Sequence, residues 1–361
     1  MLRLSSLIRR PGFSDWASRS PLLGWVVRRQ ARQVFDLMSG FVYTQTLLAC
    51  EQFGWLEALQ ESDRSIAQLA SIGGLTDDRT RLLVKAACAV GLFKLRSDVV
   101  ALSLTGCVIA QQPGLRALIR HHRLFYEDMV DPTELLRAPD PGTRLRQFWR
   151  YVETRGTGDR SGEVSPSALA QTAEYSALMT ATQDMIVSQV LASVRFRSSD
   201  SLLDVGGGQG RFAAKIRAAH PGIRAHVFDL PGVRTAEDCQ PMERTEGDFF
   251  RDPLPLGFNT VSLVRVLYDH PDDWVLRLLE KVRSYLVPQR GRLIVAEPMS
   301  SDGRANPMSE AYFGFYLLAM RGGRPRSQTE LSSLLRKAGF TQVQARPTPL
   351  PMQCSVIEAV V

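Results

Sequence analysis

Cysteine is scarce in this chain of 361 residues, and its five cysteines lie far apart without a CxxC pair. This spacing argues against a cysteine-based zinc site and a disulfide framework, and it predicts reduced thiols in a cytoplasm. Long apolar runs are also missing, so we expect no membrane-spanning helix. The N-terminus has no apolar core followed by a small-residue cleavage site, so we expect no secretory signal. The composition, 44% hydrophobic and 22% charged, is typical of a globular protein, and the length suffices for two domains.

Positive charge is concentrated in one segment. The formal net charge is +7, but residues 1–33 contain seven arginines and one aspartate, which leaves the rest of the chain nearly neutral at +1. Apolar and aromatic residues, among them Trp16 and Trp25, are interleaved with these arginines. Such a basic leader predicts peripheral contact with an anionic membrane surface. The alternative is a helix that packs its apolar side on a partner subunit while its arginines remain in water.

The first half of the chain has the pattern of a helical domain that includes a winged helix. The expected elements are a helical pattern over 34–59, helices over 65–72 and 77–90, and a strand pair over 93–104. Winged helices often bind DNA, but the second helix here opens with Asp77 and Asp78, which would repel phosphates. We therefore expect a dimerisation or packing role and no nucleic-acid partner.

The second half predicts an α/β fold with a doubly wound parallel sheet, because strands and helices alternate from residue 201 onward. A helix over 167–194 leads into this sheet, and residues 131–168 have the composition of loops around a helix centred on 148–153. After the last helix, two extended runs follow without a helix between them. This ending predicts an antiparallel hairpin at the edge of the sheet.

A glycine-rich turn follows the first strand of this sheet. The run DVGGGQG, from Asp204 to Gly210, meets the pattern D-x-G-x-G-x-G in full, with Gly206 and Gly208 at the inner positions. The dinucleotide pattern G-x-G-x-x-G/A fails, because Arg211 occupies its third glycine position. The turn therefore predicts an amino-acid-bearing ligand rather than a pyrophosphate.

Acids follow the next two strands. Asp229 ends the second strand, where an acid reaches the ribose hydroxyls of a bound nucleoside. Gly247, Asp248 and Phe249 end the region of the third strand, where the acid can bond an adenine amino group and the aromatic ring can cover the base. These elements at three successive strand ends predict a nucleoside that carries an amino acid.

Together these features resemble the metal-independent O-methyltransferases, the family of the plant phenolic and acetylserotonin enzymes. The resemblance rests on DVGGGQG, FDLP, GDFF, a D-H-x-D segment after the fourth strand and AEP, combined with the winged-helix half. It implies S-adenosylmethionine as the methyl donor, no metal, and a homodimer in which each N-terminal domain helps to build the partner's substrate pocket. The implied domains are a helical dimerisation and substrate-pocket domain over 1–185 and a Rossmann-like S-adenosylmethionine-binding domain over 186–361.

Three further runs, SLVRVLYDHPDDWVLRLL, GRLIVAEPMS and FDLMSGFVYTQTLLA, are similar to the carotenoid branch of this family in purple bacteria. That branch methylates the tertiary C-1 hydroxyl of acyclic 1-hydroxy carotenoids such as hydroxyneurosporene and demethylspheroidene. The resemblance implies a hydrophobic carotenoid substrate and a cytoplasmic enzyme in peripheral contact with the inner or photosynthetic membrane. Two alternatives stay open: methylation of another pigment or aromatic acceptor, such as a bacteriochlorophyll intermediate or a phenol, and a winged-helix regulator that binds S-adenosylmethionine without catalysis.

The resemblance assigns the donor contacts to the DVGGG turn, Asp229, Asp248, Phe249 and Arg265. The catalytic positions match less well. The histidine that serves the family as general base falls on Tyr268. One family acid falls on Glu297, whereas the second falls near Pro325 and is absent.

We therefore expect His270 to act as the general base, oriented by Asp269 or Glu297. One alternative is that His270 only packs or caps the following helix. Another is that Tyr268 orients the acceptor hydroxyl while water accepts the proton. The adjacent pair His121 and His122 has no cysteine or acid at metal spacing, so it predicts a structural role or a pocket wall.

Overall fold

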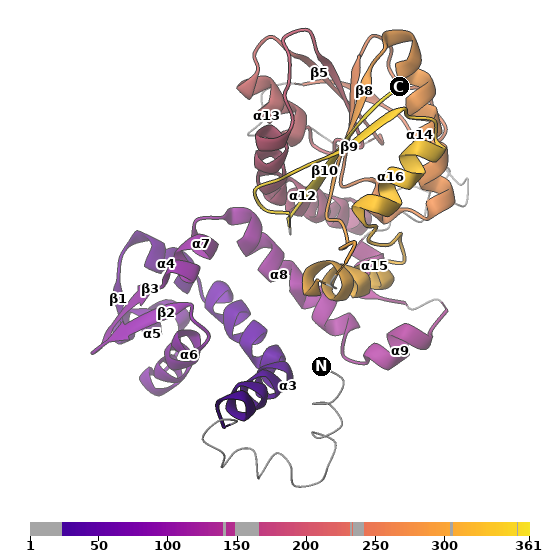
Figure 1. Cartoon of the computed structure of the whole chain (residues 1–361). Helices are drawn as coiled ribbons and strands as arrows, with labels where there is room; N and C mark the ends of the chain where they lie inside the picture. Colours follow the sequence, from indigo (N-terminus) through magenta and orange to yellow (C-terminus); the bar gives the residue numbers. More distant parts are fainter. Residues whose placement is uncertain are drawn as a thin grey trace. The chain divides into compact units, whose positions relative to one another are not determined.

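The protein is described here by a computed structural model. The described residues are 24–139, 142–148, 166–231, 233, 242–303, 306–351 and 353–361, and within helix 166–193 the side chains are described from residue 178 onward. The chain divides into two compact units, residues 1–112 and 113–361 (Figure 1). Most of the basic leader, up to residue 23, lies outside the described residues.

The first unit combines helices with a small antiparallel sheet of order β1-β3-β2. Its elements are α3 (Gly24–Gln52), α4 (Trp55–Glu61), β1 (Arg64–Ser65), α5 (Ile66–Gly73), α6 (Asp77–Ala89), β2 (Phe93–Arg96), β3 (Val99–Leu102) and α7 (Leu104–Ala110). The predicted helix pair and strand pair are confirmed. The helical pattern over 34–59 is interrupted at Gly54, whose φ of 70° separates α3 from α4. A capping box of Ser65 and Gln68 starts α5.

The second unit contains the seven-stranded sheet. Its helices are α8 (Pro113–Asp128), α9 (Pro132–Arg137), α10 (Arg144–Phe148), α12 (Pro166–Ser193), α13 (Arg211–Ala219), η2 (Leu267–Asp269), α14 (Asp272–Leu286), η3 (Val287–Gln289), the π-helix η4 (Pro307–Phe313), α15 (Gly314–Met320) and α16 (Gln328–Lys337). Its strands are β4 (Ser201–Val205), β5 (Arg224–Asp229), β6 (Glu243–Glu246), β7 (Thr260–Val264), β8 (Arg292–Glu297), β9 (Gln342–Arg346) and β10 (Ser355–Val360).

The strand order is β6-β5-β4-β7-β8-β10-β9, and the first five strands run parallel. β10 is antiparallel to both of its neighbours, with Ile357 opposite Val295 of β8 and Ala345 of β9. The predicted α/β class and the antiparallel hairpin at the edge are therefore confirmed. This ending places β9 at the edge of the sheet.

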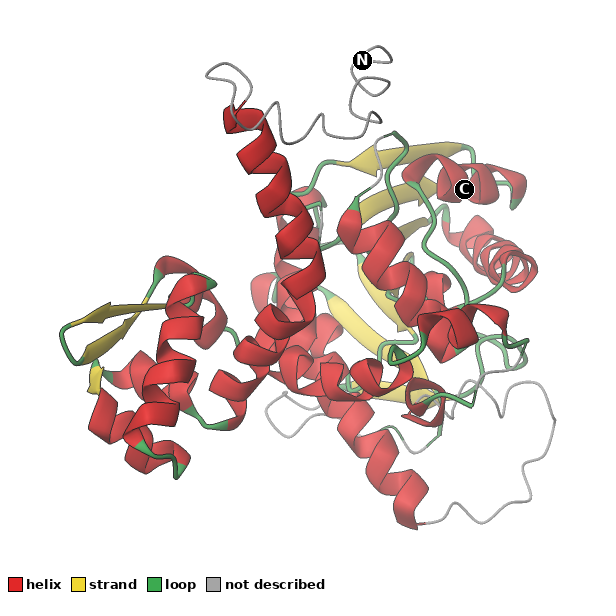
Figure 2. Ribbon diagram, turned by 90° about the horizontal axis from the view of Figure 1, so that it is seen from below, coloured by secondary structure: helices red, strands yellow, loops and turns green. Residues whose placement is uncertain are grey.

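Helices cover both faces of the sheet (Figure 2). Neighbouring residues of a strand point to opposite faces, and Leu202 and Leu203 of β4 enter different apolar layers. Leu202 packs in the layer with α12 and α13, for example with Phe212. Leu203 packs in the layer with α14 and α16, for example with Leu278 and Leu335. The two layers hold the carboxyl ends of β4, β5 and β7 in fixed positions.

Two predictions about the middle of the chain have different outcomes. The helix predicted over 167–194 is confirmed as α12. The helix predicted around 148–153 falls mostly outside the described residues, and only its first residue, the end of α10, is described. The predicted domain boundary at 185/186 lies within α12 and stays a prediction.

Candidate active site

The glycine turn joins β4 to α13 at the carboxyl end of the parallel strands. Gly206, Gly208 and Gly210 have φ values of 70°, 58° and 87°, a region in which other residues are strained. A Cβ atom on Gly206 would also lie 2.9 Å from Cγ2 of Val266 and 3.6 Å from Cε1 of Phe249. Ligands of doubly wound sheets bind at this edge. The turn is thus built where a donor site is predicted.

Asp229 ends β5 and contacts the glycine turn. Its Oδ2 atom accepts a hydrogen bond from the Gly208 N–H at 2.6 Å, and its Oδ1 atom accepts one from the Leu230 N–H at 2.7 Å. The structure therefore brings Asp229 and the turn together, although the contact with a ribose stays a prediction.

Asp204 lies beneath the same turn and is 1% exposed. Its Oδ1 atom accepts a hydrogen bond from Ser262 Oγ at 2.6 Å. Its Oδ2 atom has no hydrogen-bond partner among the described residues and would lie 2.5 Å from a Cβ atom on Gly207. Burial raises the pKa of Asp204 to about 7. The Asp204 side chain therefore supports the glycine turn, and a direct hydrogen bond from Asp204 to a ligand stays a prediction.

The segment after β6 lies beside the end of β5. The Gly247 N–H donates to the Asp229 carbonyl at 2.8 Å, which joins the two strand ends. The Asp248 carboxylate accepts a hydrogen bond from the Phe250 N–H at 2.9 Å. Phe249 is 3% exposed. Gly247 is therefore joined to Asp229, whose side chain bonds the glycine turn, and Phe249 lies against Gly206 of that turn.

Arg265 follows β7 and has a φ of 56°. Its guanidinium donates to Thr182 Oγ1 at 2.7 Å, to the Met179 carbonyl at 2.8 Å and to Gln183 Oε1. These bonds tie β7 to α12. The predicted contact between Arg265 and the donor stays a prediction.

Helix α12 also supports the glycine turn, which the sequence did not indicate. Thr180 Oγ1 donates to Gln209 Oε1 at 2.6 Å, within the turn itself. Arg211 forms two hydrogen bonds of 2.9 Å with Asp184. These partners lie 27 or more residues apart in the sequence, so no local motif could have indicated them.

Arg244 of β6 was also missed. Its Nη2 atom donates to the Gly208 carbonyl, and its buried Nη1 atom has no hydrogen-bond partner among the described residues. Burial lowers its pKa, and the nearby Asp229 opposes that shift. The sequence offered one signal for Arg244, which is its place on a strand three residues before Gly247.

The turn after β7 carries Tyr268 and His270, each 5% exposed. The Tyr268 ring lies in an apolar cluster formed largely by α8, η4 and α15, with its centroid 6.3 Å from that of Phe313. The His270 ring instead lies 5.2 Å from Phe250 and 5.9 Å from Phe249. The two side chains have different surroundings. The aromatic contacts of His270 favour packing, and its role as general base stays a prediction.

Glu297 ends β8 and is 3% exposed. Its Oε1 atom accepts hydrogen bonds from the Val266 N–H at 3.1 Å and from the Leu267 N–H. Burial raises the pKa of Glu297 to about 7, and the backbone hydrogen bonds oppose this rise. Glu297 therefore holds the turn that carries Tyr268, and its predicted role in orienting His270 stays a prediction.

Asp204 and Glu297 make a contribution to stability that falls with rising pH. Their ordinary pKa values of 3.8 and 4.5 are raised to about 7 in the folded protein. Between about pH 5 and about pH 7 these two groups hold protons in the folded state that the unfolded chain has released, so their contribution to the free energy of unfolding decreases as the pH rises. His121 and His122, whose pKa burial lowers to about 4, contribute the opposite slope over this range. The expected result is therefore a difference: relative to the original protein, Glu297→Gln, which keeps an acceptor oxygen but cannot ionise, should gain thermal stability as the pH rises from about 5 to about 7. Parallel curves for the variant and the original protein would contradict the assignment to Glu297; exposed Asp273→Asn is the control.

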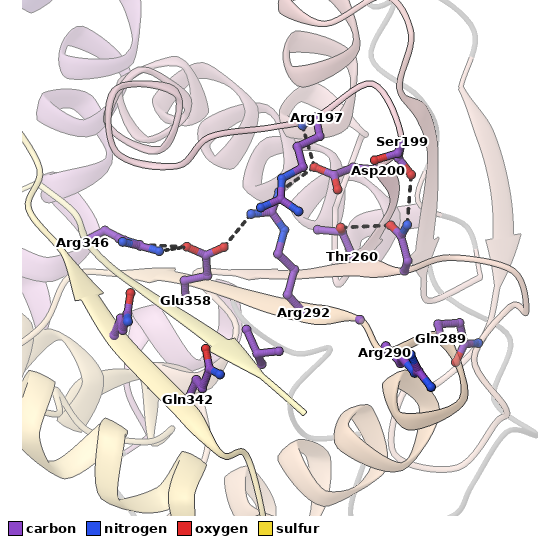
Figure 3. A pocket seen from close by; sticks show the side chains of 14 residues that line it. Arg197, Ser199, Asp200, Thr260, Gln289, Arg290, Arg292, Gln342, Arg346 and Glu358 are labelled. Atoms are coloured by element: carbon purple, nitrogen blue, oxygen red, sulfur yellow. Dashed lines mark hydrogen bonds and ion pairs between the residues drawn. The ribbon is translucent and has the colours of Figure 1, made fainter.

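A polar cavity of about 420 Å³ lies at the opposite end of the strands (Figure 3). Arg292 contacts Asp200 and Glu358 at 2.5 Å each, and Arg346 contacts Glu358 at 2.6 Å. Both acids of this cluster are thus paired with arginines. Because the ligands of such sheets bind at the carboxyl ends of the strands, we interpret this cluster as a support of the sheet.

The described residues contain no group of three histidine, cysteine, aspartate or glutamate side chains that could hold a metal ion. That no metal takes part in the reaction stays a prediction. Within the same part of the chain, no helix is long and apolar enough to cross a membrane.

Comparison with known proteins identifies the family. The profile of the O-methyltransferase domain matches residues 145–341. The chain is 38% identical over 343 residues to the demethylspheroidene O-methyltransferase of Rhodobacter capsulatus, covering 94% of this chain and 85% of the relative. It is 37% identical over 356 residues to the enzyme of the same name from Cereibacter sphaeroides, covering 95% and 90%. The solved structure of human N-acetylserotonin methyltransferase in complex with SAM has a TM-score of 0.74 at 22% identity, covering 92% of this chain and 97% of that one. With these matches and this fold, the chain belongs to the O-methyltransferase family.

Proposed function

We propose that this protein transfers a methyl group from S-adenosylmethionine to the tertiary C-1 hydroxyl of an acyclic 1-hydroxy carotenoid, such as hydroxyneurosporene or demethylspheroidene. The observation that carries the substrate is the 37–38% identity, over 94–95% of the chain, with two enzymes named for demethylspheroidene. Tyr268 at the family's histidine position supports it. A phenol has a pKa of about 10 and suits a histidine base, whereas a tertiary alcohol is a much weaker acid.

The residues at the strand ends fit the proposed donor. S-adenosylmethionine supplies a methyl group bound to a positively charged sulfur. Open space surrounds the Cβ position of Gly208, which leaves room for the amino-acid part of a ligand. In this proposal Asp229 binds the ribose hydroxyls, Asp248 the adenine amino group, and Phe249 the face of the base. Since the displacement at the methyl group is in-line, the main task of these residues is positioning.

The apolar cluster beyond Tyr268 suits a hydrophobic acceptor. It combines residues of α8, α9, α10, α12, η4 and α15. Its buried members are Phe125, Leu135, Leu145, Leu178, Tyr268, Tyr316, Leu317, Ala319 and Met320. The half-buried members packed against them, among them Tyr312 and Phe315, are the surface that an apolar acceptor would cover.

The test is an assay of the purified full chain with methyl-labelled S-adenosylmethionine and detergent-dispersed 1-hydroxyneurosporene. We expect a carotenoid product that gains one methyl on oxygen and loses its free hydroxyl. Donor binding without a methylated carotenoid, or labelling of a phenol or a tetrapyrrole instead, would contradict the proposed substrate. Donor binding combined with a salt-dependent DNA shift would indicate the regulator.

We also propose that the first unit forms a homodimer through α3. Large apolar side chains are exposed along this helix: Trp25, Val34, Phe35, Leu37, Met38, Phe41 and Val42. Large exposed apolar patches on soluble proteins usually mark an interface. A second copy is the proposed occupant, in line with a dimerisation role for the predicted domain 1–185.

Leu37→Glu should convert the dimer to a monomer, because Leu37 is 85% exposed and a buried charge at an interface is strongly unfavourable. Leu256→Glu is the matched control, since Leu256 is 81% exposed but lies outside α3. Sedimentation velocity measures both variants. A monomeric original protein, or a Leu37→Glu variant that remains dimeric, would contradict the proposal.

Peripheral membrane contact of the basic leader is a separate proposal. Of its arginines, Arg28, Arg29 and Arg32 lie on α3 and are exposed, as electrostatic contact with anionic lipid requires. Replacement of these three by glutamine should reduce co-sedimentation with anionic vesicles. Unchanged co-sedimentation would contradict this contact, and neutral vesicles provide the control.

A further inference from the structure

Two histidine–tyrosine pairs lie at the apolar cluster of the second unit. His122 Nε2 lies 2.9 Å from the Tyr312 hydroxyl, and His121 Nε2 lies 2.7 Å from the Tyr316 hydroxyl. Helix α8 supplies the histidines, and η4 and α15 supply the tyrosines. Buried polar groups carry a desolvation cost that apolar packing avoids. Two such pairs in one cluster therefore call for a functional explanation.

The two pairs differ in accessibility. His121 and Tyr316 are 8% and 5% exposed, whereas His122 and Tyr312 are only half-buried. The Tyr312 and Tyr316 rings stack with centroids 5.7 Å apart and an interplanar angle of 25°. The pairs are thus chemically alike and adjacent, but only the outer pair keeps partly exposed side chains.

A series of ring contacts connects the outer pair to the turn after β7. The Tyr312 ring lies 5.0 Å from Phe313, and Phe313 lies 6.3 Å from Tyr268. Two residues before Tyr268, the Val266 side chain lies against the backbone of Gly206 in the donor turn. Tyr312 itself belongs to a π-helix, and such turns often occur at functional sites.

We propose that Tyr312 is a catalytic residue that binds the acceptor hydroxyl and receives its proton, while His122 takes the Tyr312 proton in return. This inference rests on the proposed function. The Tyr312 oxygen accepts a hydrogen bond from the acceptor hydroxyl, and the Tyr312 O–H donates to His122 Nε2. The pair thereby takes the role predicted from the sequence for His270, whose ring instead packs against Phe249 and Phe250.

The proton transfer balances with the methyl transfer. As the acceptor oxygen forms its bond to the methyl carbon, the carbon–sulfur bond breaks and its electron pair stays on sulfur. The acceptor proton moves to the Tyr312 oxygen, the Tyr312 proton moves to His122 Nε2, and the resulting imidazolium later releases its proton to water. The products are an ether, a neutral thioether and one proton.

A weak base suffices for this step. Burial lowers the pKa of His122 to about 4, so its imidazole is neutral near pH 7 and free to accept a proton. The acceptor oxygen becomes strongly acidic as its bond to carbon forms, so no alkoxide has to form first. General base catalysis of this kind contributes a factor of about 100 to 10,000.

The test compares Tyr312→Phe with the matched variant Tyr285→Phe, using 1-hydroxyneurosporene and S-adenosylmethionine. Tyr312→Phe should lower kcat by about 100-fold or more, with unchanged donor affinity by calorimetry. Tyr285→Phe removes the same atom from a tyrosine outside the apolar cluster, whose hydroxyl donates to the Pro255 carbonyl at 2.7 Å, and should keep kcat within about threefold. His122→Gln keeps a hydrogen-bond acceptor but not a base. It should lower kcat by a larger factor than it changes KM, and it should alter the solvent isotope effect on kcat.

Three results would overturn the inference. They are a Tyr312→Phe variant with nearly unchanged kcat, an equal loss in both tyrosine variants, and a His122→Gln variant with unchanged kcat and isotope effect. If Tyr312→Phe does not fold, His122→Gln decides. Failure of the original protein to methylate the carotenoid would instead contradict the proposed function, which separates the two claims.

Discussion

Asp229→Ala is expected to lower the affinity for S-adenosylmethionine by about 30- to 150-fold, which corresponds to about 2–3 kcal/mol. The variant loses the proposed ribose contact. It also frees the Gly208 N–H, which Asp229 binds at 2.6 Å, so the glycine turn loses an anchor. Isothermal titration calorimetry measures the affinity directly and needs no acceptor.

Two controls sharpen this result. Asp229→Asn keeps one acceptor oxygen and should retain an intermediate affinity. Asp273→Asn changes an exposed carboxylate at the start of α14 and should bind the donor normally. An Asp229→Ala affinity within about threefold of the original protein would show that the donor site lies elsewhere.

Arg292→Met is expected to have the largest effect on stability, about 3 kcal/mol. The Arg292 guanidinium contacts Asp200 and Glu358 at 2.5 Å each, and all three side chains are no more than 14% exposed. Burial alone would raise the pKa of Glu358, but hydrogen bonds from Arg292 and Arg346 lower it. Removal of Arg292 leaves Asp200 buried without this cation, whereas Glu358 keeps Arg346.

Arg324→Met is the matched control in urea unfolding. Arg324 also bridges two acids, Asp272 at 3.0 Å and Glu330 at 2.8 Å, but all three side chains are 44–48% exposed. Exposed pairs contribute little, so the loss should be below about 1 kcal/mol. Equal losses in Arg292→Met and Arg324→Met would contradict the argument that burial makes the difference.

Local sequence patterns predicted those parts of the fold that depend on a single helix or strand and on its neighbours along the chain. The buried strand around Leu202 and Leu203, followed by a glycine turn and a helix, was sufficient to place the first βα unit of the sheet. The break at Gly54 was not predicted, because the apolar periodicity continues through it and a positive φ leaves no trace in that pattern.

The site was predictable only in part, for a similar reason. Asp229, Asp248 and the glycines come directly after strands, so parallel pairing was enough to bring them to one edge. Arg244 and the contacts of Arg265 with α12 depend on tertiary packing across long sequence separations. The pairing of His122 with Tyr312, 190 residues further along the chain, likewise had no local signal.

A competition assay with labelled S-adenosylmethionine distinguishes a carotenoid acceptor from a phenol directly. A 1-hydroxy carotenoid and a phenol, acetylserotonin, are offered together to the purified full chain, and the labelled products are separated by mass. We expect the label to enter the tertiary ether of the carotenoid, because Tyr268 stands at the position that the family resemblance assigns to the histidine base for phenols. Label in the phenol, with none in the carotenoid, would contradict it.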